Sequence, residues 1–317
     1  MRPMLAVVVD PAWPGRLPLR DVDMPAPAPD EALVQVQAIS LDPAEAATLA
    51  QAPAGTRPGR DFAGIVVRDA ADGSGPKAGS RVAGLVAGGS WAEYVAARTS
   101  VLVALPDAVS LIQGATLPIT GHAALDAAER AGSLLGRNVL IAFAVSGVAV
   151  MTCQLTRFGG SGHIVAVVPT AEREQLAHDS GAHHVVAGEG TEPAAQYAPY
   201  DRIFTTGGGE ALASALAHLS ADGLCVTWDV ISEGQRTLDT QQRFPTGSPG
   251  AVGAVISRGT AHSETPDSLS RLARLAGAGV VRPYIGREAF WTEIATTADD
   301  LLQGRFPGNA VLHVGSV

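Results

Sequence analysis

The sequence predicts a mixed α/β protein with two domains, one β-rich and one built on a doubly wound parallel sheet. The chain has 317 residues, enough for about two domains of roughly 150 residues each. Hydrophobic residues make up 46% and charged residues 17%, which is typical of a globular protein. Short apolar runs separated by Pro and Gly fill the first third, and apolar runs alternating with helical patterns follow from about Leu117.

The first third is expected to form antiparallel β structure. Its strand candidates are short, rich in β-branched or aliphatic residues, and bounded by Pro- and Gly-containing loops. They span residues 5–9, 32–39, 64–67, 81–86 and 92–96.

The middle of the chain predicts βαβ units. Continuous apolar runs of this kind suit strands that helices cover on both faces. The strand candidates span residues 139–144, 164–168, 184–187, 202–205, 224–228 and 251–256. Helices are expected over 171–180 and 210–219, and a third opens at Thr265-Pro266-Asp267, an N-cap followed by proline.

The last segment returns to β-rich character. It contains an amphipathic helix over 289–302, a turn at Pro307-Gly308 and a strand over 310–314. The β-rich domain therefore comprises residues 1–118 and 280–317, built from both ends of the chain. The doubly wound domain comprises residues 119–279.

Charge and cysteine content exclude several classes of function. With 22 Lys and Arg against 31 Asp and Glu, the net charge of −9 disfavours nucleic acid and anionic membranes as partners. Two cysteines support neither a disulfide framework nor a four-thiolate zinc site. The uncharged stretch 138–156 is interrupted by Ser146 and Gly147, as a buried strand, turn and helix would be, so no membrane span is expected. A cytoplasmic location is the expectation.

Several ordered motifs identify a family resemblance. They are Gly59-Arg60-Asp61-Phe62-Ala63-Gly64, Gly89-Ser90-Trp91-Ala92-Glu93-Tyr94-Val95, Ala115-Thr116-Leu117-Pro118 with Gly121, and Gly308-Asn309-Ala310-Val311-Leu312. In order and spacing the chain resembles the medium-chain dehydrogenase/reductase superfamily, in particular its zinc-free quinone oxidoreductase branch. The resemblance implies a GroES-like β-rich catalytic domain, a Rossmann-type domain that binds NADPH, and a homodimer formed through the last strand of the cofactor sheet, about 251–257.

No metal site is expected. Zinc-dependent members of this superfamily carry a Gly-His-Glu stretch where this chain has Gly59-Arg60-Asp61, and the four-cysteine structural loop is missing.

The resemblance also locates a dinucleotide site, in which the glycine fingerprint after the first strand of the Rossmann-type domain is altered. Its positions hold Phe143, Ser146 and Ala149. A benzyl group at Phe143 either packs into the core or occupies space that the dinucleotide needs. Arg173 lies where relatives bind the 2′-phosphate of NADP, unless it is an ordinary solvated residue of a helix's first turn. The residues expected to bind the cofactor are Ser146, Gly147, Val148, Ala149, Thr170, Arg173, Thr206, Gly207 and Gly208.

The expected catalytic residues lie in the β-rich domain and at its border. Relatives have an Asn-Pro stretch where this chain has Asp42-Pro43-Ala44-Glu45, so a neutral amide is replaced by an ionisable carboxyl group. In an apolar cleft Asp42 would act as a general acid or base with Glu45 nearby, or it would simply cap a helix or turn. His122 is a further candidate near the domain junction.

Two main functions follow from these patterns. The first is zinc-independent, NADPH-dependent reduction of a small-molecule quinone or α,β-unsaturated carbonyl compound. The alternative is a cofactor-independent, non-redox enzyme, a cyclase or isomerase of a biosynthetic intermediate, that has lost dinucleotide binding. The alternative is motivated by departures from the family at Phe143, Ser146, Ala123 and Thr205. A non-catalytic interaction protein on the same scaffold is a third possibility.

Overall fold

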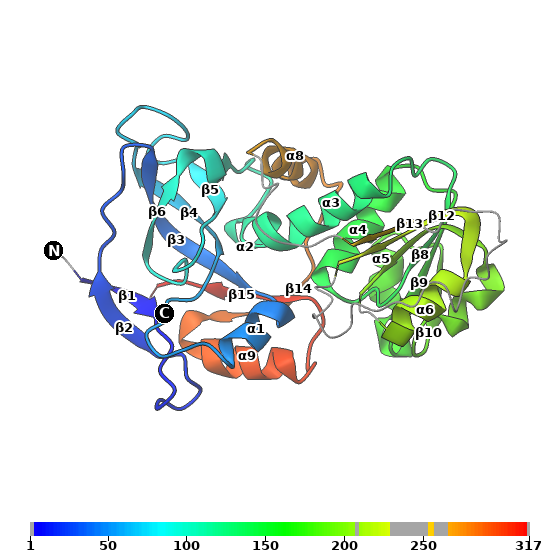
Figure 1. The fold of residues 1–317 in the computed structure, drawn as a ribbon. Coiled ribbons are helices and arrows are strands. Elements are labelled where there is room, and N and C mark those ends of the chain that lie inside the picture. The colour runs from blue at the N-terminus through cyan, green and yellow to red at the C-terminus, as the bar shows by residue number, and fades with distance from the viewer. Residues whose placement is uncertain (1–2, 207–208, 229–252, 257–265, 316–317) are drawn as a thin grey trace. The chain divides into compact units, whose positions relative to one another are not determined.

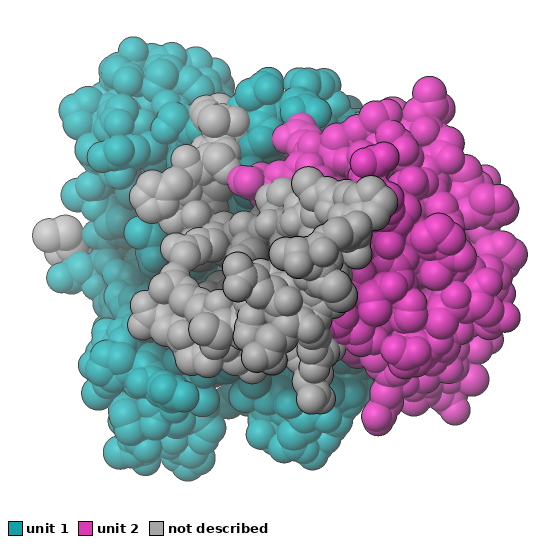
Figure 2. All heavy atoms as spheres, turned by 45° about the vertical axis from the view of Figure 1, so that its right-hand side comes forward, with its two compact units in different colours: residues 1–122, 263–317 teal, residues 123–262 magenta. Residues whose placement is uncertain are grey.

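The computed structural model describes residues 3–206, 209–228, 253–256 and 266–315. The chain forms two compact units, one from residues 1–122 and 263–317 and the other from residues 123–262 (Figure 2). The sequence predicted the corresponding boundaries after residues 118 and 279. The return to the first unit comes earlier than predicted because helix α8 (Pro266–Gly277) packs against strand β7 (Leu102–Ala104) of that unit.

The first unit is built on a seven-stranded sheet (Figure 1). The strand order is β14-β15-β3-β4-β5-β7, and β6 also pairs with β3. All pairs are antiparallel except β14 with β15. The remaining strands of this sheet are β3 (Glu31–Leu41), β4 (Asp61–Arg68), β5 (Arg81–Leu85), β6 (Tyr94–Arg98), β14 (Ile285–Phe290) and β15 (Asn309–His313). Strands β1 (Pro3–Val7) and β2 (Leu19–Asp23) form a separate antiparallel pair.

Short helices complete this unit. They are α1 (Pro43–Leu49), η1 (Thr99–Val101), α2 (Leu111–Gly114), the π-helical turn η2 (Leu117–Gly121), η6 (Trp291–Glu293) and α9 (Ile294–Leu302). The helix predicted over 289–302 begins only at Ile294. Its first two residues belong to β14 instead, because Ala289 and Phe290 pair with Leu312 and His313 of β15.

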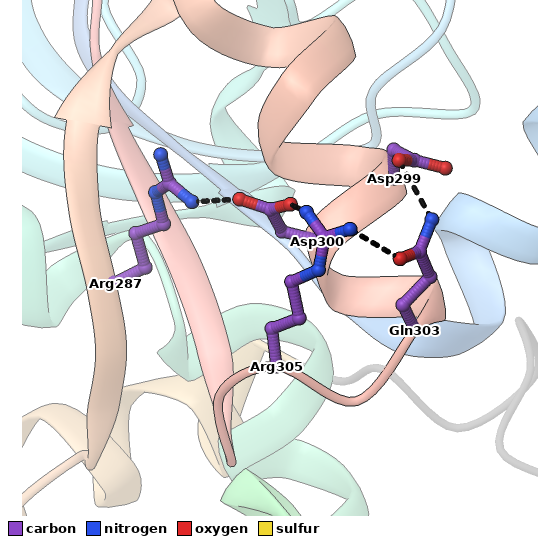
Figure 3. A network of polar contacts seen from close by, with 5 residues as sticks. All are labelled: Arg287, Asp299, Asp300, Gln303 and Arg305. Carbon is purple, nitrogen blue, oxygen red and sulfur yellow. Dashed lines mark hydrogen bonds and ion pairs between the residues drawn. The ribbon is translucent and has the colours of Figure 1, made fainter.

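An ion-pair network fixes helix α9. The Asp300 carboxylate, 7% exposed, accepts hydrogen bonds from both Arg287 and Arg305 (Figure 3). Burial acts to raise the pKa of Asp300, but the hydrogen bonds and charges of the two arginines outweigh it and hold that pKa below its ordinary value. Gln303 donates to Asp299 at 2.8 Å. Helix α9 packs against α1, so the network supports the helix that carries the predicted catalytic carboxyl groups.

The second unit confirms the prediction of a doubly wound parallel sheet. Its six strands are all parallel in the order β10-β9-β8-β11-β12-β13, so the order reverses between β8 and β11. The strands are β8 (Asn138–Ile141), β9 (His163–Val168), β10 (His184–Ala187), β11 (Tyr200–Thr205), β12 (Leu219–Thr227) and β13 (Gly253–Ile256). The helices are α3 (His122–Arg130), which starts at the border of the units, α4 (Gly147–Phe158), η3 (Ala171–Arg173), α5 (Glu174–Asp179), η4 (Glu192–Tyr197) and α6 (Gly209–Ala217).

The uncharged stretch 138–156 forms β8, a turn and most of α4, as the sequence predicted. Among the residues placed by the structure, no helix combines the length and the apolar character that a membrane crossing requires.

Candidate functional site

Three carboxyl groups gather in the first unit where β3 leads into α1. Asp42 follows the last residue of β3 and is the N-cap of α1, and Glu45 lies in the first turn of that helix. Asp61 opens β4. Continuing the antiparallel register of β3 and β4 brings Ser40 opposite Asp61, and the Ser40 hydroxyl donates to the Asp61 carboxyl group at 2.8 Å.

Asp61 is the most deeply buried of the three, with 1% of its surface exposed. Its Oδ2 accepts from Ser40, whereas its buried Oδ1 has no hydrogen-bond partner among the described residues. Burial raises the pKa of Asp61 to about 7; the hydrogen bond from Ser40 and the charge of Arg60 act to lower it, and the charge of Asp42 raises it further.

Asp42 and Glu45 are half-buried, so both combine partial solvent access with a low-dielectric setting. The backbone N–H of Glu45 donates to Asp42 Oδ1 at 2.7 Å. Burial raises the pKa of Asp42 although hydrogen bonds from the backbone of Glu45 and Ala44 oppose the shift. Burial raises the pKa of Glu45 well above its ordinary value, and the charges of Asp61 and Asp42 raise it further. A raised pKa lets a carboxyl group hold its proton to higher pH than an ordinary carboxyl group does, which favours a role in general acid–base chemistry.

His122 does not join this cluster. It is half-buried at the start of α3, and none of the interactions that the described residues make with Asp42, Glu45 or Asp61 involves it. Thr120, two residues earlier, accepts a 2.8 Å hydrogen bond from Asn309 of β15, a buried contact that ties η2 to the sheet.

The second unit places the altered fingerprint at the carboxyl end of β8, beside the point where the strand order reverses. In sheets of this type ligands bind at that point. Phe143 has φ +58°, a left-handed conformation that is unfavourable for a residue with a side chain. Its carbonyl accepts from Val145 N at 2.7 Å, closing a tight turn. Phe143 is half-buried and belongs to neither of the two hydrophobic clusters formed by the described residues of this unit.

Ser146 begins the helix that follows this turn. It is the N-cap of α4, and its hydroxyl accepts from Ala149 N at 3.1 Å. Gly147 and Ala149 are buried and Val148 is half-buried in the first turn of this 12-residue helix. A helix N-terminus at the strand-order reversal suits a phosphate group, because its backbone N–H groups and its dipole both favour negative charge.

The other predicted cofactor residues lie after the neighbouring strands. Thr170 is exposed and precedes η3, and Arg173 is half-buried at the end of η3. Thr206 directly follows β11, and its carbonyl accepts from the Thr205 hydroxyl at 3.2 Å. Gly207 and Gly208 lie outside the described residues. The α4 N-terminus suits the pyrophosphate of a nicotinamide dinucleotide, whereas Phe143, in the turn before that helix, is a poor fit to it.

We also searched the described residues for side chains that could bind a metal ion. Within the described ranges, no group of three or more His, Cys, Asp or Glu side chains could hold a metal ion. Cys153 and Cys225 are buried, and burial raises the pKa of each thiol to about 12, so neither is a ready thiolate ligand.

Sequence reasoning missed the functional interest of Asp61 and Ser40. Asp61 entered the sequence analysis only within a family motif and as part of a stretch that lacks zinc ligands, without a role of its own. Its signal was a charged residue at the head of the apolar run Phe62-Ala63-Gly64-Ile65-Val66, since a buried strand rarely accommodates a carboxyl group without a role.

Comparison with known proteins gives one family match and several relatives. Residues 28–107 match the alcohol dehydrogenase GroES-like domain. A trans-enoyl reductase of Pyricularia oryzae is 32% identical over 185 residues, 52% of this chain and 52% of its own, so this chain spans about half of that relative. The quinone oxidoreductase of Rattus norvegicus is 28% identical over 300 residues, 89% of this chain and 88% of its own.

Solved structures share the fold over nearly the whole chain. The quinone oxidoreductase from Coxiella burnetii has a TM-score of 0.84 at 23% identity, covering 99% of this chain and 100% of its own. A thermostable alcohol dehydrogenase from Pyrobaculum aerophilum has a TM-score of 0.86 at 20% identity, with the same coverage.

Proposed function

Because this chain belongs to the medium-chain dehydrogenase/reductase superfamily of oxidoreductases, we propose that it is a zinc-independent, NADPH-dependent reductase of a small quinone or α,β-unsaturated carbonyl compound. The observation that carries the proposal is the N-terminus of α4 at the strand-order reversal, capped by Ser146 and followed one strand later by Arg173. The two main relatives are named for reactions of this class.

In this proposal the residues of the second unit bind and orient the cofactor. The backbone N–H groups at Gly147 and Val148 bind the pyrophosphate, and Arg173 pairs with the 2′-phosphate. A bound nicotinamide supplies the hydride. The protein excludes water and fixes the geometry of transfer.

Reduction of an activated double bond consumes a proton as well as a hydride. Asp42 and Glu45 are the proposed donors because each holds its proton more tightly than an ordinary carboxyl group. In that step the carboxyl O–H bond breaks, the proton joins the reduced substrate, and solvent later returns a proton to the carboxylate. Partial exposure gives both groups the access to solvent that this return requires.

A fluorescence titration with NADPH tests cofactor binding. Saturable binding at micromolar to low millimolar concentration is expected, with Arg173→Gln weaker and Arg130→Gln unchanged. Arg130 is a suitable control because it lies in the same unit but pairs with Asp126 within α3. Absence of saturable binding at millimolar NADPH would refute the reductase.

The non-redox alternative is favoured by one observation, the half-exposed Phe143 side chain at the edge where the dinucleotide would lie. In that case the carboxyl groups alone would drive a cyclisation or isomerisation by proton transfer. Turnover without any nicotinamide, abolished in Asp42→Asn, would support this alternative. Undiminished activity in that variant would count against a carboxyl role in either reaction.

A homodimer located in the cytoplasm completes the proposal. Among the strands that the structure describes, β13 is the last of the six-stranded sheet, and pairing there with a second copy would extend the sheet across a two-fold axis. Sedimentation at micromolar concentration is expected to give twice the mass of the chain, and a monomeric mass would contradict this part of the proposal.

A further inference from the structure

The carboxyl group of Asp61 is buried with little to stabilise its charge, and it has no role in the proposed reaction. It is a carboxyl group with 1% exposure, and within the described part of the chain it forms no ion pair. One oxygen accepts a single hydrogen bond, from Ser40, and the other accepts none. An ionised carboxylate that is buried with an oxygen lacking any donor is strongly disfavoured.

The surroundings of Asp61 favour the neutral acid further. Asp42 and Glu45 approach from α1, and their negative charges oppose a third charge at Asp61. Arg60, the preceding residue, is the cation that acts on all three carboxyl groups and lowers the pKa of each. Ser90 contributes no charge; its hydroxyl donates to the Asp61 backbone carbonyl at 2.9 Å.

We propose that Asp61 is a positioning residue that keeps a proton on Oδ1 up to about neutral pH and thereby sets the proton affinity of Glu45. The inference deepens the proposed function, because it rests on Glu45 as a proton donor. Asp61 is buried from solvent, and its charge acts on that donor. While Asp61 is neutral, Glu45 can give up its proton; once Asp61 ionises, its charge holds the proton on Glu45.

Infrared spectroscopy of the intact protein tests the protonation directly, because a protonated carboxyl group has a carbonyl stretch that a carboxylate lacks. A component of this band should titrate near pH 7 and be missing in Asp61→Asn. In Ser40→Ala the component should persist to higher pH, because the hydroxyl that favours the ionised form is gone. A band that Asp61→Asn leaves unchanged would show that Asp61 is ionised and overturn the proposal. If Asp61→Asn does not fold, Ser40→Ala decides the question. A band whose titration midpoint Ser40→Ala leaves unchanged would also overturn the proposal.

The same spectra test the coupling without any turnover. The component that Glu45→Gln removes should titrate at lower pH in Asp61→Asn, by about one pH unit, the size of coupling typical of neighbouring carboxyl groups. In the active reductase, the pH dependence of kcat should show a matching shift of its basic limb. A uniform loss of kcat with an unchanged pH profile would mean that Asp61 serves structure only. Lack of NADPH-dependent turnover in the parent protein would refute the reductase, while the spectra would still decide the role of Asp61.

Discussion

Replacing Asp61 with Asn should stabilise the first unit by an amount that grows with pH. The folded protein raises the pKa of Asp61 from the ordinary 3.8 to about 7, whereas the unfolded chain leaves it near the ordinary value. The stability that the neutral acid contributes is therefore complete below about pH 4 and is lost as the pH rises to about 7. Asparagine has a similar shape and never ionises, so the variant does not lose folding stability in this way as the pH rises.

The size of the effect follows from the shift. A change of about three pH units at ~1.36 kcal/mol each gives an upper limit of about 4 kcal/mol between pH 4 and pH 8. Relaxation around the charge and the coupling to Asp42 and Glu45 reduce the measured value, so about 2 kcal/mol is a reasonable lower expectation. Any fixed cost of fitting the asparagine NH₂ group is the same at both pH values and cancels in the comparison.

Urea unfolding of the parent protein and Asp61→Asn at pH 4 and pH 8 measures this difference, and amide exchange of Ala63 and Val66 on β4 restricts the readout to the first unit. Asp23→Asn, at the exposed end of β2, is the control and should show no comparable trend. An Asp61→Asn effect that is equal at both pH values would refute the reasoning, because it would mean that Asp61 has the same pKa in the folded and unfolded states.

Three further predictions concern the second unit. Ser146→Ala should cost about 1 kcal/mol of stability through loss of the cap, and it should weaken NADPH binding in a fluorescence titration. Ser110→Ala, which removes the cap of α2 in the first unit, should leave NADPH binding unchanged. Arg173→Gln should weaken NADPH by about tenfold or more with little effect on NADH, and equal losses for both would contradict the 2′-phosphate role. Phe143→Gly should be more stable than Phe143→Ala by about 1 kcal/mol in thermal unfolding, because both lose the side chain but glycine accepts φ +58°.

The sequence predicted the doubly wound sheet well because strands in its middle are buried on both faces. Runs such as Val139-Leu140-Ile141 and Ile164-Val165-Ala166 are apolar on both faces, and both appear as central parallel strands. Strand β2, with the sequence Leu19-Arg20-Asp21-Val22-Asp23, escaped prediction because it is polar and pairs only with β1. Its strand character comes from that pairing and not from its own composition.

Some residues of the candidate site could likewise be predicted from local sequence, and others could not. Asp42 and Glu45 could be found from the sequence because they are three residues apart, and spacing within one turn is a local property. Asp61 could not, because its burial and its bond to Ser40 depend on the register between β3 and β4, which joins residues 21 positions apart. Phe143 was recognised as a departure, but its left-handed conformation and its partial exposure depend on the turn that the folded sheet imposes.

The two sequence interpretations of Asp42, helix cap and acid, turn out to be compatible. The cap hydrogen bond from Glu45 N favours the ionised form, and the pKa of Asp42 is raised nonetheless because burial outweighs that bond. Capping also fixes the carboxyl group at the start of α1, next to Glu45, which is what a proton-transferring group needs. Asparagine, which the family resemblance implies at this position, can make the same cap but holds no acidic proton. Aspartate in its place therefore keeps the local structure and adds a titratable group, which is the physical basis for proposing Asp42 as an acid.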